Sequence, residues 1–74
     1  MPGYQLTAII EREGNLFIAR CVELDIASKG TSGATAMANL KMAVRSFVEH
    51  AGEAEILQRL AREVEIAQFE IDGC

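Results

Sequence analysis

The sequence is poor in aromatic residues and has one proline and no tryptophan. Three phenylalanines and one tyrosine are the only aromatics among 74 residues, so the core must be built from aliphatic side chains. Half of the residues are hydrophobic, which indicates a folded chain and not a disordered one. At this length we expect a single domain, residues 1–74, near the size at which one core only just offsets the loss of chain entropy.

Long apolar runs are also absent. No segment approaches the roughly 20 apolar residues that a membrane-spanning helix needs. The start, MPGYQLT, has no basic leader followed by an apolar stretch, so we expect no signal peptide and no membrane association. Cysteine is scarce too, and we expect no disulfide between Cys21 and Cys74, because small secreted domains normally carry more cysteines. These absences favour the cytoplasm.

Basic residues are also few. Seven basic residues stand against eleven acidic ones, and the formal net charge is -4. Binding to a nucleic-acid backbone depends on clustered lysine and arginine, which this sequence does not show. The balance therefore disfavours nucleic acid and other acidic partners and favours basic ones.

The clearest local pattern is a β-hairpin near the start of the chain. Tyr4–Glu13 and Leu16–Glu23 alternate as strands do, and Gly14 and Asn15 between them form a two-residue loop of the kind that adopts a primed turn. A loop of this length fixes the register. The predicted pairs are Glu13 with Leu16, Ile10 with Ala19, Ala8 with Cys21 and Leu6 with Glu23.

This register gives the hairpin two apolar faces. The inner face carries Leu6, Ala8, Ile10, Phe17, Ala19 and Cys21, and the outer face carries Thr7, Ile9, Glu11, Leu16, Ile18, Arg20 and Val22. A solvated antiparallel sheet normally shows polar residues on its free side. We therefore expect the outer face to be covered, either by another chain or by the C-terminal segment. The residues predicted to form this interface are Ile9, Leu16, Ile18, Arg20 and Val22.

A long amphipathic helix follows within residues 30–51. Its apolar positions recur at the helical period and are Ala36, Leu40, Ala43, Val44, Phe47 and Ala51. Ser32 is the expected N-cap, and Gly52 suits a left-handed residue just after the helix. Met37 widens the apolar stripe, whereas Met42 projects toward the polar side, as a contact residue or as an isolated surface residue.

The remaining segments complete an α+β order. Ile26–Lys29 is predicted as a short third strand, and residues 53–62 as a second helix with Ile56, Leu57 and Leu60 on one side. Residues 64–71 read as a further strand whose apolar positions change face partway. The predicted fold is a three- to four-stranded antiparallel sheet with helices packed on one face, in the order β-β-β-α-α-β.

Candidate catalytic and metal-ligating residues are few. His50 is the only histidine and is expected to close a helix at the surface, and Cys21 faces the core. The acidic residues of the strand region are Glu11, Glu23 and Asp25, but Glu11 and Glu23 fall on opposite faces of the hairpin and do not converge on a metal. We predict no enzymatic activity, no metal and no cofactor.

One combination of residues resembles a known family. The hairpin runs into a Cys-x-Glu-Leu segment, a glycine-containing turn and an Ala-x-x-Asn-Leu helix, which are here Cys21, Glu23, Leu24, Gly30, Ala36, Asn39 and Leu40. In this order and at these spacings they resemble the N-terminal domain of HicB-like antitoxins. The match covers roughly the first 50 residues.

The resemblance implies a fold similar to a double-stranded-RNA-binding domain or to part of ribonuclease H. It also implies a role, because HicB proteins neutralise HicA, a small toxin that cleaves messenger RNA, by covering it. An acidic antitoxin against a basic RNA-handling toxin agrees with the charge balance. Val22 stands where many members have proline, and Thr31 and Thr35 stand where acidic residues are usual.

These observations lead to two readings of function. The first is a HicB-like antitoxin-type module, itself homo-oligomeric, that binds a basic HicA-type toxin. The alternative is a homo-oligomeric structural or regulatory protein with no toxin partner. We expect no DNA binding from this chain, because the sequence leaves no room after residue 74 for the separate DNA-binding segment that fuller members of the family carry.

Overall fold

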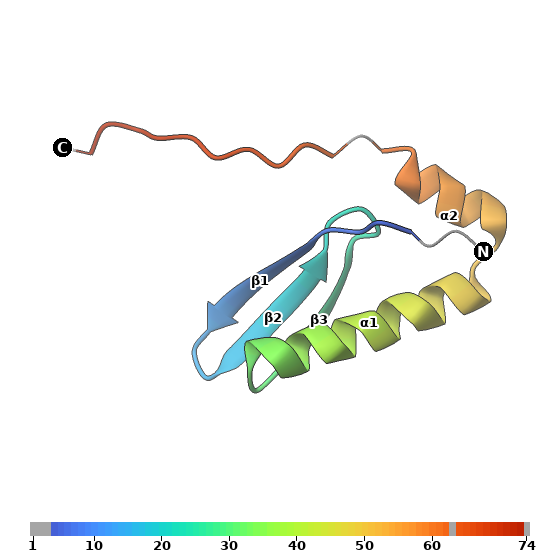
Figure 1. Cartoon of the computed structure of the whole chain (residues 1–74), viewed down its shortest axis with the longest axis horizontal. Coiled ribbons are helices and arrows are strands. Elements are labelled where there is room, and N and C mark those ends of the chain that lie inside the picture. Colours follow the sequence, from blue (N-terminus) through green and yellow to red (C-terminus); the bar gives the residue numbers. More distant parts are fainter. Residues whose placement is uncertain (1–3, 63, 74) are drawn as a thin grey trace.

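The computed structural model describes residues 4–62 and 64–73, and it has an α+β fold with an antiparallel sheet followed by two helices (Figure 1). The strands are β1 (Ala8–Glu13), β2 (Leu16–Cys21) and β3 (Ile26–Gly30), and the helices are α1 (Gly33–His50) and α2 (Glu53–Leu60). The strands lie side by side in the order β1-β2-β3, so β1 and β3 are the sheet edges. No helix in the described ranges is long and apolar enough to cross a membrane.

The hairpin has the predicted register. Glu13 pairs with Leu16, Ile10 with Ala19 and Ala8 with Cys21. Gly14 has a φ of 63° and Asn15 has no positive φ, which is the pattern of a II′ turn. Both strands are shorter than predicted, although the backbone N–H of Val22 still donates to the Thr7 carbonyl at 3.0 Å.

A tight turn joins β2 to the third strand, which was predicted within one residue of its observed bounds. Asp25 occupies the left-handed region with a φ of 56°, and its N–H donates to the Cys21 carbonyl at 2.9 Å. Leu24 in this turn is buried and belongs to the core. The turn therefore reverses the chain and fills the end of the core at the same time.

Helix α1 begins as predicted and covers the inner face of the sheet. The hydroxyl of Ser32 accepts from the Thr35 N–H at 3.0 Å and donates to the Thr35 hydroxyl at 3.0 Å. The core under α1 consists of Ala19, Cys21, Leu24, Ala36 and Leu40, with Leu6, Ala8, Phe17, Ile26, Met37, Val44, Phe47 and Leu60 packed against it. Met37 thus contacts the core as predicted, and Met42 is exposed.

The junction between the helices differs from the prediction. Gly52 has a φ of -68° and a ψ of 151°, so it is extended and not left-handed. The reason is that α2 begins at the next residue, and extended backbone is what an N-cap position requires. Ala51 ends α1, and its N–H donates to the Phe47 carbonyl at 2.8 Å.

Helix α2 is held against the end of the sheet by apolar contacts and by arginine hydrogen bonds. Ile56 is buried, and the Arg59 guanidinium donates to the Leu24 carbonyl at 2.6 Å and lies 4.6 Å from the centroid of the Phe47 ring. Leu60 packs against the core, but Leu57, which was predicted to share that side, is mostly exposed. The short helix α2 therefore packs only some of its apolar side chains against the core.

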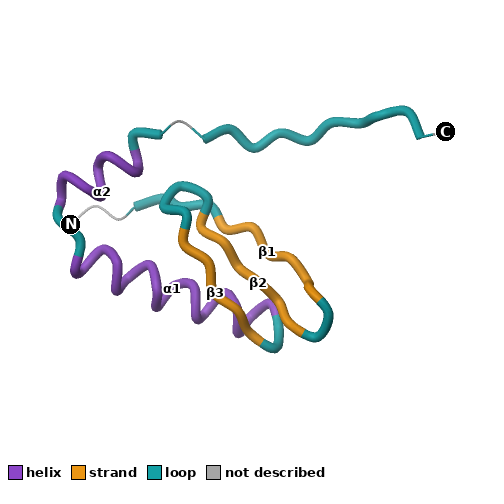
Figure 2. Tube along the Cα trace, turned by 180° about the vertical axis from the view of Figure 1, so that it is seen from behind, coloured by secondary structure: helices purple, strands orange, loops and turns teal. Residues whose placement is uncertain are grey.

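The predicted fourth strand was wrong. Residues 64–73 leave α2 as an extended segment that joins no sheet in the described chain (Figures 1 and 2). The change of face noted in the sequence gives a physical reason. Val64 and Ile66 point to one side of a regular strand and Phe69 and Ile71 to the other, so a sheet covered on one side would bury only half of these apolar side chains.

Candidate functional site

The outer face of the sheet is the surface opposite α1, and the strand register determines its residues. In β1 and β2 the pairs Ile9 with Arg20, Glu11 with Ile18 and Glu13 with Leu16 share this side. The partners of β3 extend it, because Lys29 lies opposite Ile18 and Ala27 lies opposite Arg20. Sequence analysis did not include Ala27 and Lys29, although the parity of a paired third strand would have added them.

The predicted interface residues lie together on this face and are not covered. Ile9 is 39% exposed and Leu16 is 41% exposed, whereas Ile18 and Val22 are half-buried and Arg20 is exposed. By contrast, Ala19 and Cys21 on the inner side of the same strand are almost completely buried. Every residue from 64 to 73 is exposed, so the C-terminal segment does not cover the outer face within the chain.

Charged residues of both signs surround the apolar centre of the outer face. Glu11 on β1 and Lys29 on β3 lie on either side of Ile18. Arg20 Nη1 lies 3.6 Å from Asp25 Oδ1, and both side chains are more than half exposed. An exposed pair of this kind contributes little to folding, so both charges are free to interact with a partner.

The Cys-x-Glu-Leu segment has a structural role. Oε1 of Glu23 accepts from the Thr7 backbone N–H at 2.7 Å, and Oε2 accepts from the Thr7 hydroxyl at 2.7 Å. Partial burial raises the pKa of Glu23, but the hydrogen bonds from Thr7 outweigh it, and the net pKa is below the ordinary value. Cys21 Sγ lies 3.9 Å from Oε1 of Glu23 and is buried, so it is not placed as a nucleophile.

The glycine turn and the Ala-x-x-Asn-Leu helix are also structural. A Cβ on Gly30 would lie 2.4 Å from the Ala36 backbone nitrogen, so β3 and α1 meet too closely for any other residue there. The Asn39 side-chain amide donates to the Lys29 carbonyl at 2.8 Å, and Leu40 is in the core. The residues that carry the resemblance therefore take part in packing α1 on the sheet or in hydrogen bonds at the end of the hairpin.

The acidic residues considered in the sequence do not form one site. Glu11 lies on the outer face, Glu23 is bound to Thr7, and Asp25 pairs with Arg20. The structure brings together no group of three metal-ligating side chains within residues 4–62 and 64–73. His50 is at the exposed end of α1, where its Nδ1 lies 2.7 Å from the Ser46 carbonyl oxygen. Cys74 lies outside the described residues.

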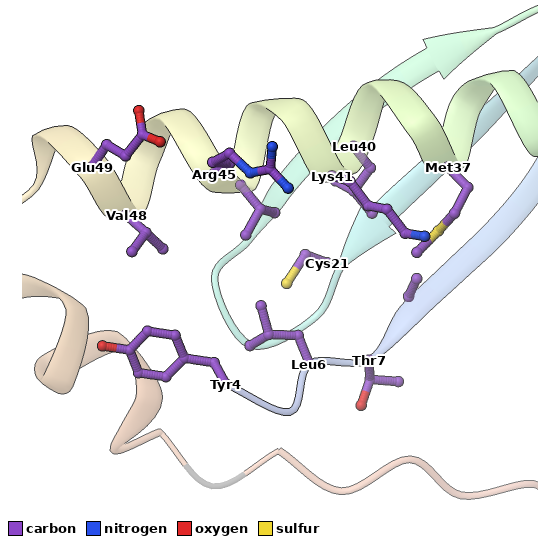
Figure 3. Close-up of a pocket in the computed structure, with 12 residues that line it drawn as sticks. Tyr4, Leu6, Thr7, Cys21, Met37, Leu40, Lys41, Arg45, Val48 and Glu49 are labelled. Atoms are coloured by element: carbon purple, nitrogen blue, oxygen red, sulfur yellow. The ribbon is translucent and has the colours of Figure 1, made fainter. Parts of the chain in front are cut away.

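A second surface, which sequence analysis missed, is an open groove of about 660 Å³ between α1 and the β1 side of the sheet (Figure 3). Its apolar lining comes from Leu6, Ala8, Met37, Leu40, Val44 and Val48. Lys41, Arg45 and Glu49 line it from α1, and Tyr4 and Thr7 from the segment before β1. The pattern of α1 predicts the apolar residues but not that the sheet leaves some of them uncovered.

Comparison with known proteins did not identify a relative of this chain. No protein-family model, no curated protein and no solved structure matches this chain. The functional argument therefore depends on the two surfaces and on the sequence pattern.

Proposed function

We propose that this protein is a HicB-like antitoxin-type binding module that neutralises a HicA-type RNA-cleaving toxin by direct contact. The contact surface in this proposal is the outer face of the sheet, centred on Ile9, Leu16, Ile18, Arg20 and Val22. The protein acts by covering its partner, with no catalytic step and no cofactor of its own. In this proposal the fold is a variant of the HicB or double-stranded-RNA-binding-like arrangement, or of part of ribonuclease H, without a fourth strand.

The observation that carries the proposal is the uncovered apolar patch on the outer face. Ile9 and Leu16 are exposed beside half-buried Ile18, and charged residues surround them. An apolar centre with a polar rim is the usual composition of a protein-binding surface. The net charge of -4 supports a basic partner, since opposite potentials speed encounter and add specificity.

The sequence pattern supports the same proposal through the order of its elements. A β-hairpin, a Cys-x-Glu-Leu turn, a short third strand and an Ala-x-x-Asn-Leu helix follow one another here as they do in the family it resembles. Because these residues specify packing, they support a shared architecture and leave the choice of partner to the surface.

The proposal is tested by co-expression with its candidate toxin. The candidate is a short basic protein with a Gly-Ser-His or Gly-Asn-His segment, encoded in the reading frame next to this one. Cells expressing that toxin should grow when the wild-type protein is present. An Ile18→Asp variant should lose the protection, whereas Met42→Asp, which places the same charge on the exposed side of α1, should keep it. Continued killing in the presence of abundant folded protein would refute the antitoxin role.

A second candidate function is a homo-oligomeric structural or regulatory protein without a toxin. The apolar character of the outer face favours it, because a second copy can cover that patch as well as a toxin can. The two candidates separate by the effect of Ile18→Asp on the mass of the purified protein in solution. If Ile18→Asp splits an assembly of the purified protein and no adjacent frame encodes a basic partner, the second candidate is the better one.

A further inference from the structure

The groove lies between α1 and the chain at the start of β1, where Leu6, Thr7 and Ala8 line it. Helix α1 lies chiefly over β3 and β2 and least over β1. Ile10, on the inner side of β1, is consequently 46% exposed although its paired residue Ala19 is fully buried. Beyond β1 nothing continues the sheet in the described chain, so the apolar side chains of α1 that face this edge have no strand beneath them.

The edge of β1 can accept one more strand. β1 pairs only with β2, so the backbone N–H and C=O groups along its other side have no partner strand. An extended peptide that binds such an edge forms a ladder of main-chain hydrogen bonds and places alternate side chains on the two faces of the sheet. The groove meets this edge at Ala8 and continues past it along Tyr4, Leu6 and Thr7. Inner-face side chains at that end of the added strand would therefore lie near the apolar residues of α1 that line the groove.

The C-terminal segment, residues 64–73, has the properties of such a peptide. It is extended, it forms no hydrogen bond with the rest of the described chain, and Phe69 is 85% exposed and Ile71 is 80% exposed. Ten residues in strand conformation span about 33 Å, which exceeds the roughly 20 Å of a six-residue strand such as β1. The segment therefore has exposed apolar side chains and is long enough to follow the whole edge of β1.

Charge complementarity connects the segment to the groove. Lys41 and Arg45 lie one turn apart on α1 and overlook the groove, with Glu49 at its far end beside Val48 (Figure 3). The segment carries Glu65, Glu70 and Asp72 between its apolar residues and has no basic residue. An acidic, apolar strand thus meets a groove that is apolar below and mainly basic along its helix.

We propose that this groove binds residues 64–73 of a second copy of the chain, so that two protomers exchange their C-terminal segments. In the single chain residues 64–73 extend beyond α2 without joining the sheet (Figure 1), and each of them is exposed. The groove is open as well. A reciprocal exchange between two copies covers both surfaces of both protomers and closes the assembly. This self-association uses a different surface from the one considered above, and it does not depend on the toxin because it leaves the outer face free.

Mixing two charge-reversed variants tests the exchange. One chain carries Lys41→Glu and Arg45→Glu in the groove, and the other carries Glu65→Lys and Glu70→Lys in the segment; all four side chains are exposed. Wild-type protein should have the mass of two chains. Each variant alone should lose the dimer, because like charges then meet at both contacts, and an equimolar mixture should recover it, because both contacts are again opposite in sign.

Three results would overturn the proposal. The first is a monomeric wild type, including one in which the segment binds the groove of its own chain and is protected from hydrogen exchange. The second is that the charge-reversed variants remain dimeric when alone. The third is that they are monomeric alone and stay monomeric when mixed. Circular dichroism identifies chains that are folded, and only folded chains are scored.

A second pair of variants tests the apolar part of the contact. Phe69→Asp and Gln68→Asp each add one negative charge to the segment, but only Phe69→Asp removes a large apolar side chain. Loss of the dimer in Phe69→Asp and its retention in Gln68→Asp would support the exchange, and equal behaviour would overturn it. Neither change touches the outer face, so toxin protection measured on the same variants reports separately on the proposed function.

Discussion

The two faces of one small sheet have different roles. On the inner face Ala19 and Cys21 are sealed by α1, and Gly30, Ala36 and Leu40 determine how closely the helix approaches. On the outer face the same strands present Ile9, Leu16 and Ile18 with nothing above them in the described chain. The residues that resemble the HicB-like pattern are on the packed side. We therefore place the proposed binding surface on the outer face, which carries none of this pattern.

The largest expected effect is the loss of a core side chain from the packed side. Leu40→Ala should lower the free energy of unfolding by about 3 kcal/mol, because it removes buried methyl groups and leaves a cavity. The matched control is Leu57→Ala on α2, where the leucine is mostly exposed and the expected loss is about 0.5 kcal/mol. Urea denaturation measures both. Equal losses would contradict the burial assigned to α1.

The close approach of β3 to α1 gives the next prediction. Gly30→Ala should cost about 2 kcal/mol of unfolding free energy, because the new methyl group would collide with the Ala36 backbone. In Gly33→Ala the nearest atom to the methyl is 3.9 Å away, so the helix propensity of alanine should stabilise the protein by about 0.5 kcal/mol. Thermal unfolding followed by circular dichroism should therefore shift in opposite directions for the two variants.

The contribution of Glu23 to the free energy of unfolding should depend on pH. Because the folded pKa lies below the ordinary glutamate value, Glu23 stabilises the fold above that value, and this stabilisation is lost as the pH falls through the lowered folded pKa. Glu23→Gln should cost about 1 kcal/mol near neutral pH and less in acid. Thr7→Val keeps the backbone donor and removes the hydroxyl, so it should cost less. Denaturation at several pH values checks both, and a cost independent of pH would contradict the assignment.

The smallest effect on folding is expected from the outer face. Leu16→Asp changes an exposed side chain at the start of β2 and should alter the free energy of unfolding by no more than about 0.5 kcal/mol. The same change should nevertheless abolish binding or assembly through this face. Unfolding and binding measured on the same preparation test this, and a variant that binds as the wild type does would remove Leu16 from the surface.

The sequence predicts the local features better than the distant ones. Gly14 and Asn15 determine the hairpin register, and Ser32 determines the start of α1, because both depend on neighbouring residues. The prediction of a left-handed Gly52 was wrong because the conformation of this residue depends on where α2 begins. The prediction of a strand at residues 64–71 was wrong for a related reason, since a segment becomes a strand only if the folded chain brings a free sheet edge beside it.

The candidate surfaces show the same limit. Alternation along the hairpin predicts that Ile9, Ile18 and Leu16 share one side, and they do. Lys29 was missed because its side is known only once β3 has paired, and the groove was missed because it depends on how α1 crosses the sheet. Periodicity identifies which residues need cover, but the tertiary arrangement determines which of them receive it.

The most direct test of the proposed binding surface is the affinity of purified variants for a basic HicA-type toxin, the partner proposed above. Ile18→Asp should weaken binding by about tenfold or more, because it places a charge at the apolar centre of the contact. Met42→Asp should bind as the wild type does, since Met42 is 69% exposed on α1 and away from the outer face. Equal affinities for the two variants, with both chains folded, would contradict the claim that the uncovered side of the sheet is the binding surface.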